Sequence, residues 1–263
     1  MFTTHFKMTT HPFAETTATT GLLQDQRITQ GLARLAYLTT AGTLGLITGP
    51  TGVGKTSLIK LFLNSLSPNR YQPVYVYLTH VGANGLLKLI VAAMGETPKY
   101  NKDRVFLQIL DKVRQSETTT LLVLDEAHLI EPQALIDLRL LVSSILEDQP
   151  TLKIVLSGQE TLRDQLKQST HADLLHRISV RYHIPTMTRP QTIAYLDHHM
   201  AQAGASNKVF DDEAKALIHD YANGLPRQIN NIATACLINA ATQNLQKINE
   251  PLVNDTMAEF RLP

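Results

Sequence analysis

The residues best suited to chemistry form one octet, Gly49–Thr56, which reads GPTGVGKT. Its three glycines let a loop curl so that backbone N–H groups converge on an anion, and a following helix adds partial positive charge. The lysine and threonine supply a cation for phosphate and a hydroxyl for a divalent metal ion. We expect Lys55 to reach the β- and γ-phosphates and Thr56 to bind Mg²⁺. The predicted nucleotide-binding residues are Pro50, Thr51, Gly52, Val53, Gly54, Lys55, Thr56 and Ser57.

A pair of carboxylates complements this loop. The apolar run Leu121–Leu124 ends in Asp125 and Glu126. We expect Asp125 to hold Mg²⁺ through its water shell and Glu126 to orient and deprotonate the attacking water. An acidic pair at a strand end also occurs in ordinary solvated turns, but the glycine loop about 70 residues upstream favours the catalytic interpretation. Together they predict an enzyme that hydrolyses ATP with Mg²⁺.

The elements around these motifs alternate between strand and helix. The short apolar run Leu44–Thr48 precedes the glycine loop, and apolar positions at helical spacing follow it, as they also do over Gln24–Leu38. Further strands are predicted at Pro73–Leu78, Thr119–Leu124, Leu152–Leu156 and Ser179–Ile184, and helices at Gly85–Met94, Arg104–Arg114, Pro132–Leu146 and Glu160–Leu166. This alternation predicts an α/β fold with a parallel sheet covered on both faces.

The chain past Pro185 has a different pattern. It is helical to the end, with candidates at Pro190–Ala203, Asp211–Asn223, Pro226–Asn244 and Glu250–Glu259. At the other end, eight of the first twenty residues are threonine, which predicts an extended arm with Phe2, Phe6 and Phe13 as aromatic anchors. We therefore expect an arm over 1–20, a nucleotide-binding domain over 21–185 and a helical domain over 186–263.

Composition limits the function classes. The 263 residues are 43% hydrophobic and 18% charged, which excludes disordered and fibrous classes. No run approaches the roughly 18 apolar residues of a membrane span, and no secretory signal is present, so we expect a cytoplasmic protein without membrane contact. The single cysteine, Cys236, forbids an internal disulfide and is interpreted as core filler. The net charge of +1 provides no overall basic field, so any DNA contact requires a local patch.

Several further segments carry a family resemblance. With the glycine loop and acid pair, Ile154–Gln159, Leu175–Tyr182 and Gly224–Asn230 resemble AAA+ ATPases of the ExeA/TniB/TnsC group. The segment His5–Phe13 is similar to the start of ExeA-like proteins. The resemblance covers nearly the whole chain. It implies a P-loop AAA+ fold, with a three-layer parallel sheet and a C-terminal helical lid domain, that binds ATP and Mg²⁺.

The resemblance also implies roles for individual residues. Ser157 or Gln159 is implied as the polar sensor of the γ-phosphate or attacking water, with the choice open. Arg227 is implied as the lid arginine that reaches the nucleotide phosphates. Arg177 is implied as the arginine finger presented to a neighbouring subunit, with Arg181 as the alternative; each role needs a permanently charged, planar donor. The other interpretation of Arg177 and Arg227 is a surface ion pair.

Two sets of positions have weaker implied roles. His11, Pro12 and Phe13 are implied to line the adenine side, with simple core anchoring as the alternative. Thr79 and His80 follow the second predicted strand, where relatives often carry a residue that couples the catalytic glutamate to DNA or to a partner.

A third group of residues suggests DNA contact. Lys99, Lys102 and Arg104 lie with Tyr100 in the insertion that faces the central pore in DNA-wrapping relatives. A solvated helix start is the alternative interpretation. In a ring or helical filament the patch repeats around the duplex, so that phosphate neutralisation adds up over subunits.

These observations lead to one functional hypothesis and its rivals. The resemblance implies an ATP-dependent regulator of DNA transposition that forms a homo-oligomer on double-stranded DNA, marks target sites, recruits a transposase and works with a target-selection adaptor. One rival is an ExeA-like secretion-assembly ATPase, although those proteins continue into a membrane helix and a peptidoglycan-binding module and this chain ends at Pro263. A nucleotide-gated signalling module and a helicase loader are two further rivals; Glu126 argues against the signalling module.

Overall fold

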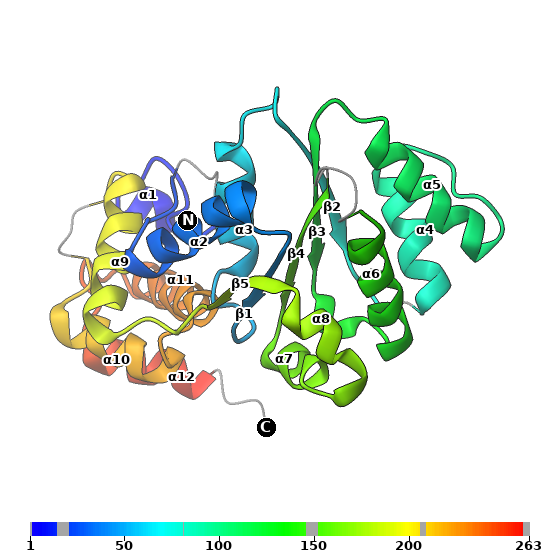
Figure 1. Ribbon diagram of the computed structural model, residues 1–263. Helices are drawn as coiled ribbons and strands as arrows, with labels where there is room; N and C mark the ends of the chain where they lie inside the picture. The colour runs from blue at the N-terminus through cyan, green and yellow to red at the C-terminus, as the bar shows by residue number, and fades with distance from the viewer. Residues whose placement is uncertain (1, 15–20, 81, 146–151, 206–208, 260–263) are drawn as a thin grey trace. The chain divides into compact units, whose positions relative to one another are not determined.

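The computed structural model describes residues 2–14, 21–80, 82–145, 152–205 and 209–259 (Figure 1). The chain divides into two compact units. An α/β unit comprises residues 26–51 and 55–184, and a helical unit comprises residues 1–25, 52–54 and 185–263. The second unit resumes at Pro185, one residue before the boundary expected from the sequence.

A five-stranded parallel sheet forms the centre of the α/β unit, in the order β2-β3-β4-β1-β5. Its strands are β1 (Leu44–Thr48), β2 (Tyr71–Tyr77), β3 (Thr119–Asp125), β4 (Leu152–Gly158) and β5 (Ile178–His183). Nearly every residue of the three inner strands is buried, which explains their continuous apolar runs. β2 begins at Tyr71 and β4 ends at Gly158, each two residues beyond the predicted limit, because backbone pairing with Thr119 and Thr48 continues there.

Helices cover both faces of this sheet. Figure 1 shows α2 (Gln26–Ala41) and α3 (Lys55–Ser65) on one side and α4 (Ala83–Ala93), α5 (Lys102–Arg114) and α6 (Pro132–Ile145) on the other. The short helices α7 (Glu160–Leu166) and α8 (Ala172–His176) connect β4 to β5. The predicted α/β class and the parallel sheet with helices on both faces are therefore confirmed. Leu146, the predicted end of α6, lies outside the described residues.

The helical unit contains α1 (Phe2–His5), α9 (Arg189–Gln202), α10 (Asp212–Ala222), α11 (Pro226–Thr242) and α12 (Glu250–Glu259). Local signals start its helices: the backbone N–H of Thr188 donates to Gln191 Oε1 over 2.9 Å before α9, and the Asp211 carboxylate accepts from the Ala214 N–H over 2.8 Å before α10. The unit has its own apolar core, which includes Leu196, Ile218, Cys236, Leu237 and Val253.

The N-terminal segment differs from the extended arm expected from its threonines. Phe2–His5 form a helix, and Phe2, Phe6, Met8 and Phe13 are buried in the core of the helical unit. The Thr9 N–H also donates to the Ala203 carbonyl oxygen over 2.8 Å. Burial of large apolar side chains offsets the entropic cost of ordering this polar segment. Residues 15–20, which include four of the threonines, lie outside the described residues.

No helix in the part of the chain that the structure describes combines the length and the apolar character needed to cross a bilayer.

Candidate nucleotide site

The glycine loop runs from the end of β1 to the start of α3. Gly52 and Gly54 have φ angles of 79° and 109°, in the left-handed region that side chains with a Cβ rarely adopt. The loop therefore turns sharply into the N-terminus of α3, which begins at Lys55. This strand, loop and helix sequence is the context in which the octet binds phosphate.

Lys55 lies over the loop that precedes it. Its side chain is buried, and Nζ donates to the carbonyl oxygens of Gly49 over 2.9 Å and Pro50 over 3.0 Å. A buried ammonium group needs polar partners, and phosphate oxygens can take the place of these carbonyls. The position of Lys55 is thus compatible with the predicted contact to the nucleotide phosphates.

Thr56 and Asp125 meet across the α/β unit. The Thr56 hydroxyl donates to Asp125 Oδ2 over 2.8 Å, and Asp125 is fully buried at the end of β3. Hydroxyl and carboxylate oxygens are ligands that Mg²⁺ prefers, so this pair fits the metal ion implied by the sequence. Bound there, Mg²⁺ would neutralise charge on the phosphate oxygens.

Tyr75 is a neighbour of Asp125 that sequence reasoning missed. Its hydroxyl donates to Asp125 Oδ2 over 2.6 Å from the adjacent strand β2. Burial and the hydrogen bond to Asp125 raise the pKa of Tyr75 well above its ordinary value, so the hydroxyl remains a donor. The alternation of Tyr71, Tyr75 and Tyr77 in the sequence indicates a shared face, but it does not indicate contact with a carboxylate 50 residues later.

Glu126 occupies a strained backbone position. Its φ of 57° and ψ of 34° are left-handed, which is uncommon for a residue with a side chain. Its N–H donates to Asp125 Oδ1 over 3.0 Å, and His128 Nδ1 lies 3.3 Å from Glu126 Oε2 without hydrogen-bond geometry. Such strain is typical of functional positions, and it turns Glu126 away from the course of β3 directly after Asp125.

The two sensor candidates lie at the end of β4. Ser157 pairs in register with Ile47 of β1, and its Oγ is fully buried without a hydrogen-bond partner among the described residues. Gln159 follows as the half-buried residue before α7, and its side chain does not cap that helix. Buried hydroxyls are normally hydrogen-bonded, so the unsatisfied oxygen favours Ser157 as the residue that binds a ligand atom.

Thr79 and His80 are not brought to Glu126. Both are exposed after β2, and neither has a hydrogen bond or ion pair to Glu126 in the described part of the chain. The structure therefore does not join Thr79 or His80 to Glu126.

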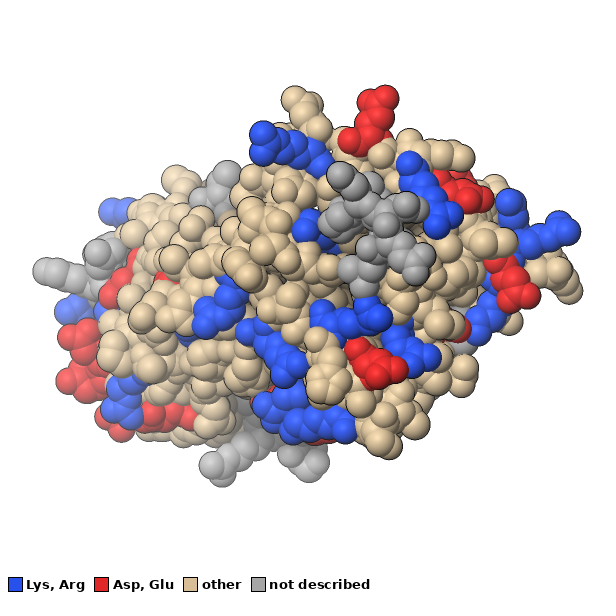
Figure 2. Space-filling model, viewed as in Figure 1, with Lys and Arg blue, Asp and Glu red and all other residues tan. Residues whose placement is uncertain are grey.

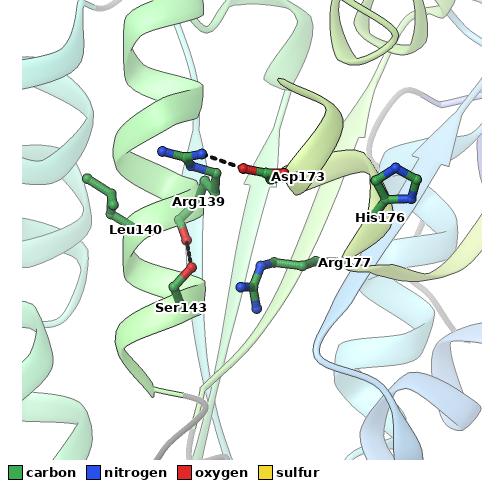
Figure 3. A pocket seen from close by; sticks show the side chains of 6 residues that line it. All are labelled: Arg139, Leu140, Ser143, Asp173, His176 and Arg177. Atoms are coloured by element: carbon green, nitrogen blue, oxygen red, sulfur yellow. Dashed lines mark hydrogen bonds and ion pairs between the residues drawn. The ribbon is translucent and has the colours of Figure 1, made fainter. Parts of the chain in front are cut away.

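Arg177 lines an open pocket between α6 and α8 (Figure 3). Arg139 and Asp173 form an ion pair of 2.7 Å there, and the Arg177 side chain points toward α6 on the side of Ser143. Arg177 has no ion pair among the described residues, although it is only partly exposed. Basic side chains also gather over α8 and β5 in the space-filling view (Figure 2).

Arg181, the alternative finger, has a different environment. Its Nη2 donates to the Leu175 carbonyl oxygen over 2.8 Å, and its side chain lines a second pocket with Arg34 and Tyr37. The guanidinium group of Arg181 is thus tied to its own unit, whereas that of Arg177 is not.

Arg227 lies at the start of α11 in the helical unit, which also includes residues 52–54. Within that unit, the Arg227 N–H donates to the Gly52 carbonyl oxygen over 3.2 Å, and its side chain is exposed. A Cβ added to Gly52 would lie 2.8 Å from the Arg227 Cβ, so glycine permits this close approach.

Pro12 and Phe13 are buried in the helical unit, and the Phe13 ring lies 5.9 Å from the His199 ring. His11 is exposed and its ring meets the edge of Phe2 at 5.1 Å. These contacts support core anchoring, the alternative interpretation of this segment.

The three predicted DNA contacts separate into two kinds. Lys102 Nζ forms an ion pair of 2.8 Å with Asp137, a largely buried residue of α6. Lys99 and Arg104 are exposed, as is Tyr100 at 91% exposure. Lys102 therefore has a structural partner, and only the other two cations present their side chains freely to solvent.

A glycine loop after β1, an acid pair after β3 and a strand order that places β1 between β4 and β5 define a P-loop nucleotide hydrolase. Residues 39–166 match the family described as AAA domain. Over this part the chain is similar to AAA-family ATPases, which agrees with the fold and the ATPase class that the sequence predicted.

The chain is 29% identical over 256 residues to General secretion pathway protein A of Aeromonas hydrophila. The match covers 94% of this chain but only 46% of that protein, so the chain spans about half of the relative's length.

Solved structures share the fold. The Aeropyrum pernix ORC1 protein in complex with DNA superposes with a TM-score of 0.72 at 17% identity, over 96% of this chain and 70% of that one. Drosophila ORC bound to DNA has a TM-score of 0.73 at 16% identity, over 100% and 66% of the two chains. The Thermotoga maritima RuvB Holliday junction branch migration motor has a TM-score of 0.59 at 16% identity, over 91% and 70%.

Proposed function

We propose that this chain is an ATP-dependent regulator of DNA transposition that assembles on double-stranded DNA in the cytoplasm. ATP binding drives assembly of subunits into a ring or filament, and hydrolysis releases them. The assembly marks a target site, with which a target-selection adaptor and a transposase interact. The observation that carries the assembly step is Arg177, an arginine with no acidic partner among the described residues, in an open pocket of an ATPase domain.

The chemistry of hydrolysis follows from the α/β unit. Lys55 binds the β- and γ-phosphates, Thr56 and Asp125 hold Mg²⁺, and Glu126 orients and deprotonates the attacking water. Ser157 senses the γ-phosphate, which its unsatisfied buried hydroxyl supports. Gln159 is the second candidate for that role. Arg227 is the arginine proposed for the nucleotide phosphates. Pro12 and Phe13 are kept as core anchors, because their contacts favour that role over lining the adenine side.

Assembly follows from the position of Arg177. Asp173 is already paired with Arg139, so the permanent charge of Arg177 is available to an anion from outside its own unit. A γ-phosphate held by a neighbouring subunit is such an anion, and an arginine supplied in trans is worth roughly 10³–10⁵ in rate. Nucleotide and subunit contact are thereby coupled.

DNA binding rests on the exposed cations of the α4–α5 connection and α5. Lys99 and Arg104 present two charges per subunit, and an oligomer repeats them along the duplex. The proteins of similar fold include ones solved on DNA, which is consistent with this role. Repetition removes the need for a strongly basic chain.

A second candidate function is a secretion-assembly ATPase. The match to General secretion pathway protein A over 94% of this chain favours it. The nucleotide chemistry is the same in both proposals, so only the partner distinguishes them.

The test is binding of the purified protein to random-sequence duplex DNA with a non-hydrolysable ATP analogue, with ADP and without nucleotide, combined with negative-stain imaging. Rings or filaments on DNA with the ATP analogue alone support the DNA-assembly step. Lys55→Ala is the matched control and should form none. Absence of DNA binding at low salt in every nucleotide state rejects the transposition proposal. Assembly without DNA would then favour the secretion-type role.

The transposase step needs its own test. Protein assembled on DNA should retain a transposase in a pull-down only with the ATP analogue, and should release it when hydrolysable ATP is added. Retention independent of nucleotide would contradict ATP-controlled recruitment.

A further inference from the structure

The carboxylate of Asp125 receives donors from three directions. Oδ2 accepts from the Thr56 hydroxyl over 2.8 Å and from the Tyr75 hydroxyl over 2.6 Å, and Oδ1 accepts from the Glu126 N–H over 3.0 Å. We propose that Tyr75 is a positioning residue that sets how tightly the nucleotide site takes up its divalent cation. This inference depends on the ATPase site alone, and not on transposition or secretion.

The first step of the argument is the geometry of the carboxylate. Asp125 is fully buried at the end of β3, so its carboxylate is oriented by protein groups and not by solvent. Two ionised oxygens offer about four lone-pair directions in one plane. The three donors come from α3, from β2 and from the backbone that follows β3, and they therefore define that plane.

The second step concerns the donors to Oδ2 in the metal-bound state. A hydroxyl that binds a cation through an oxygen lone pair keeps its proton, so Thr56 can bind the metal ion and still donate to Oδ2. The Tyr75 hydroxyl is the other side-chain donor to Oδ2, and no metal contact is assigned to it. A separation of 2.6 Å is typical of a strong O–H···O⁻ bond to a charged acceptor. Tyr75 therefore holds the carboxylate in place in the state in which the cation is bound.

The third step compares Tyr75 with a tyrosine on the same strand that makes no such contact. Tyr75 and Tyr77 lie two residues apart on β2, an edge strand of the sheet, and their side chains share a face. Both rings are partly exposed, at 37% and 62%. The Tyr77 hydroxyl has no hydrogen-bond partner among the described residues, so the chain contains a second tyrosine on the same face of β2 that lacks the bond to Asp125.

The experiment compares Tyr75→Phe with Tyr77→Phe in the full chain. A fluorescent ATP analogue is bound in EDTA, and Mg²⁺ is then titrated to find the concentration that half-saturates the metal-dependent change in fluorescence. Partners that hold metal-binding carboxylates are typically worth 10- to 100-fold in metal affinity. We expect Tyr75→Phe to raise the half-saturating Mg²⁺ concentration about tenfold, with affinity for the analogue in EDTA within about twofold of wild type.

Tyr77→Phe should leave both quantities unchanged. An unchanged Mg²⁺ half-saturation in Tyr75→Phe would overturn the proposal, as would an equal loss of affinity in EDTA and in Mg²⁺, which indicates general damage to the site. If Tyr75→Phe unfolds at a lower temperature than Tyr77→Phe, the same titration in the Asp125→Asn background decides the matter. In that background Tyr75→Phe should cause no further rise in the half-saturating Mg²⁺ concentration, because the charged acceptor of the Tyr75 hydrogen bond is no longer present. An additive shift contradicts action through Asp125.

Discussion

Arg139 pairs with Asp173 over 2.7 Å, and this ion pair removes the acidic side chain nearest to Arg177 in the pocket that all three line. The geometry leaves Arg177 without an internal counter-ion in the described part of the chain, whereas Arg181 donates to a backbone carbonyl. Two arginines of one motif thus have different environments. The contrast ranks Arg177 ahead of Arg181 as the residue that acts on a neighbouring subunit.

Replacing Arg177 with alanine should abolish turnover but leave nucleotide binding by the monomer intact. The loss expected for a finger supplied in trans is roughly 10³-fold or more. Mixing Arg177→Ala with Lys55→Ala should restore part of the ATPase rate, because one variant supplies the finger and the other the nucleotide. The rate of the mixture is the measurement. Absence of restoration, with Arg181→Ala showing it instead, would transfer the role to Arg181.

Lys55→Ala should abolish nucleotide binding. Loss of the ammonium group removes the cation that faces the phosphates. We expect the dissociation constant for ATP to rise at least 100-fold, a loss of roughly 3 kcal/mol in binding free energy. Titration with a fluorescent ATP analogue measures it, and a circular dichroism spectrum like that of wild type excludes unfolding. Binding within tenfold of wild type would contradict the phosphate role of Lys55.

Glu126→Gln should retain ATP binding and lose hydrolysis. A glutamine keeps the size and the left-handed backbone of Glu126 but cannot accept a proton, and general-base catalysis contributes roughly 10²–10⁴ in rate. We expect the ATP-bound assembly to accumulate, as measured by steady-state turnover together with light scattering. Turnover equal to that of wild type would remove Glu126 from the catalytic assignment.

Lys102 and the pair Lys99 and Arg104 should respond differently to substitution. Lys102→Ala leaves the buried Asp137 carboxylate without its cation and should lower the free energy of unfolding by roughly 1–3 kcal/mol. Lys99→Ala with Arg104→Ala should leave stability nearly unchanged and lower the salt dependence of DNA binding by roughly two counter-ions per subunit. Denaturant unfolding and binding at several salt concentrations separate the effects. An unchanged salt slope rejects the DNA role of the pair.

The helical unit should lose stability in acid because of His199. Burial first, and then the charge of His198, lower the pKa of His199 from 6.5 to about 4. The unfolded chain therefore binds more protons between these values, so the free energy of unfolding falls as pH drops from 6.5 to 4 and is insensitive to this group above 6.5. The full effect is about 3 kcal/mol. Denaturant unfolding at pH 7.5 and pH 4.5 measures it.

His199→Gln should flatten that dependence, since glutamine does not titrate. His198→Gln is the matched neighbour: the His198 ring is part-buried and bonds to the Gly21 carbonyl oxygen at 3.1 Å. An unchanged pH dependence in His199→Gln contradicts the assignment to His199.

Much of the fold could be predicted because its signals are periodic and local. β1, α7 and α12 have the predicted limits, and most other elements differ by one to three residues at their ends. The ends differ because hydrogen bonding, rather than hydrophobicity, decides where a strand or helix stops. α8 was not predicted, since five residues are too few to show a helical period. The arm over 1–20 was expected to be extended because of its threonines, but Phe2–His5 are helical, whereas the expected anchors Phe2, Phe6 and Phe13 are buried as predicted.

The sequence by itself determined the nucleotide chemistry, because the residues that bind phosphate are consecutive and the acid pair follows directly from one strand. Gly49–Thr56 and the pair Asp125 and Glu126 can be recognised without coordinates. Only the tertiary structure decided the partners of these groups. Tyr75 bonds to Asp125, Lys102 pairs with Asp137, and Asp173 is taken by Arg139 and not by Arg177. Strand order, register and helix packing bring such residues together, and none of these is written in the spacing of neighbouring residues.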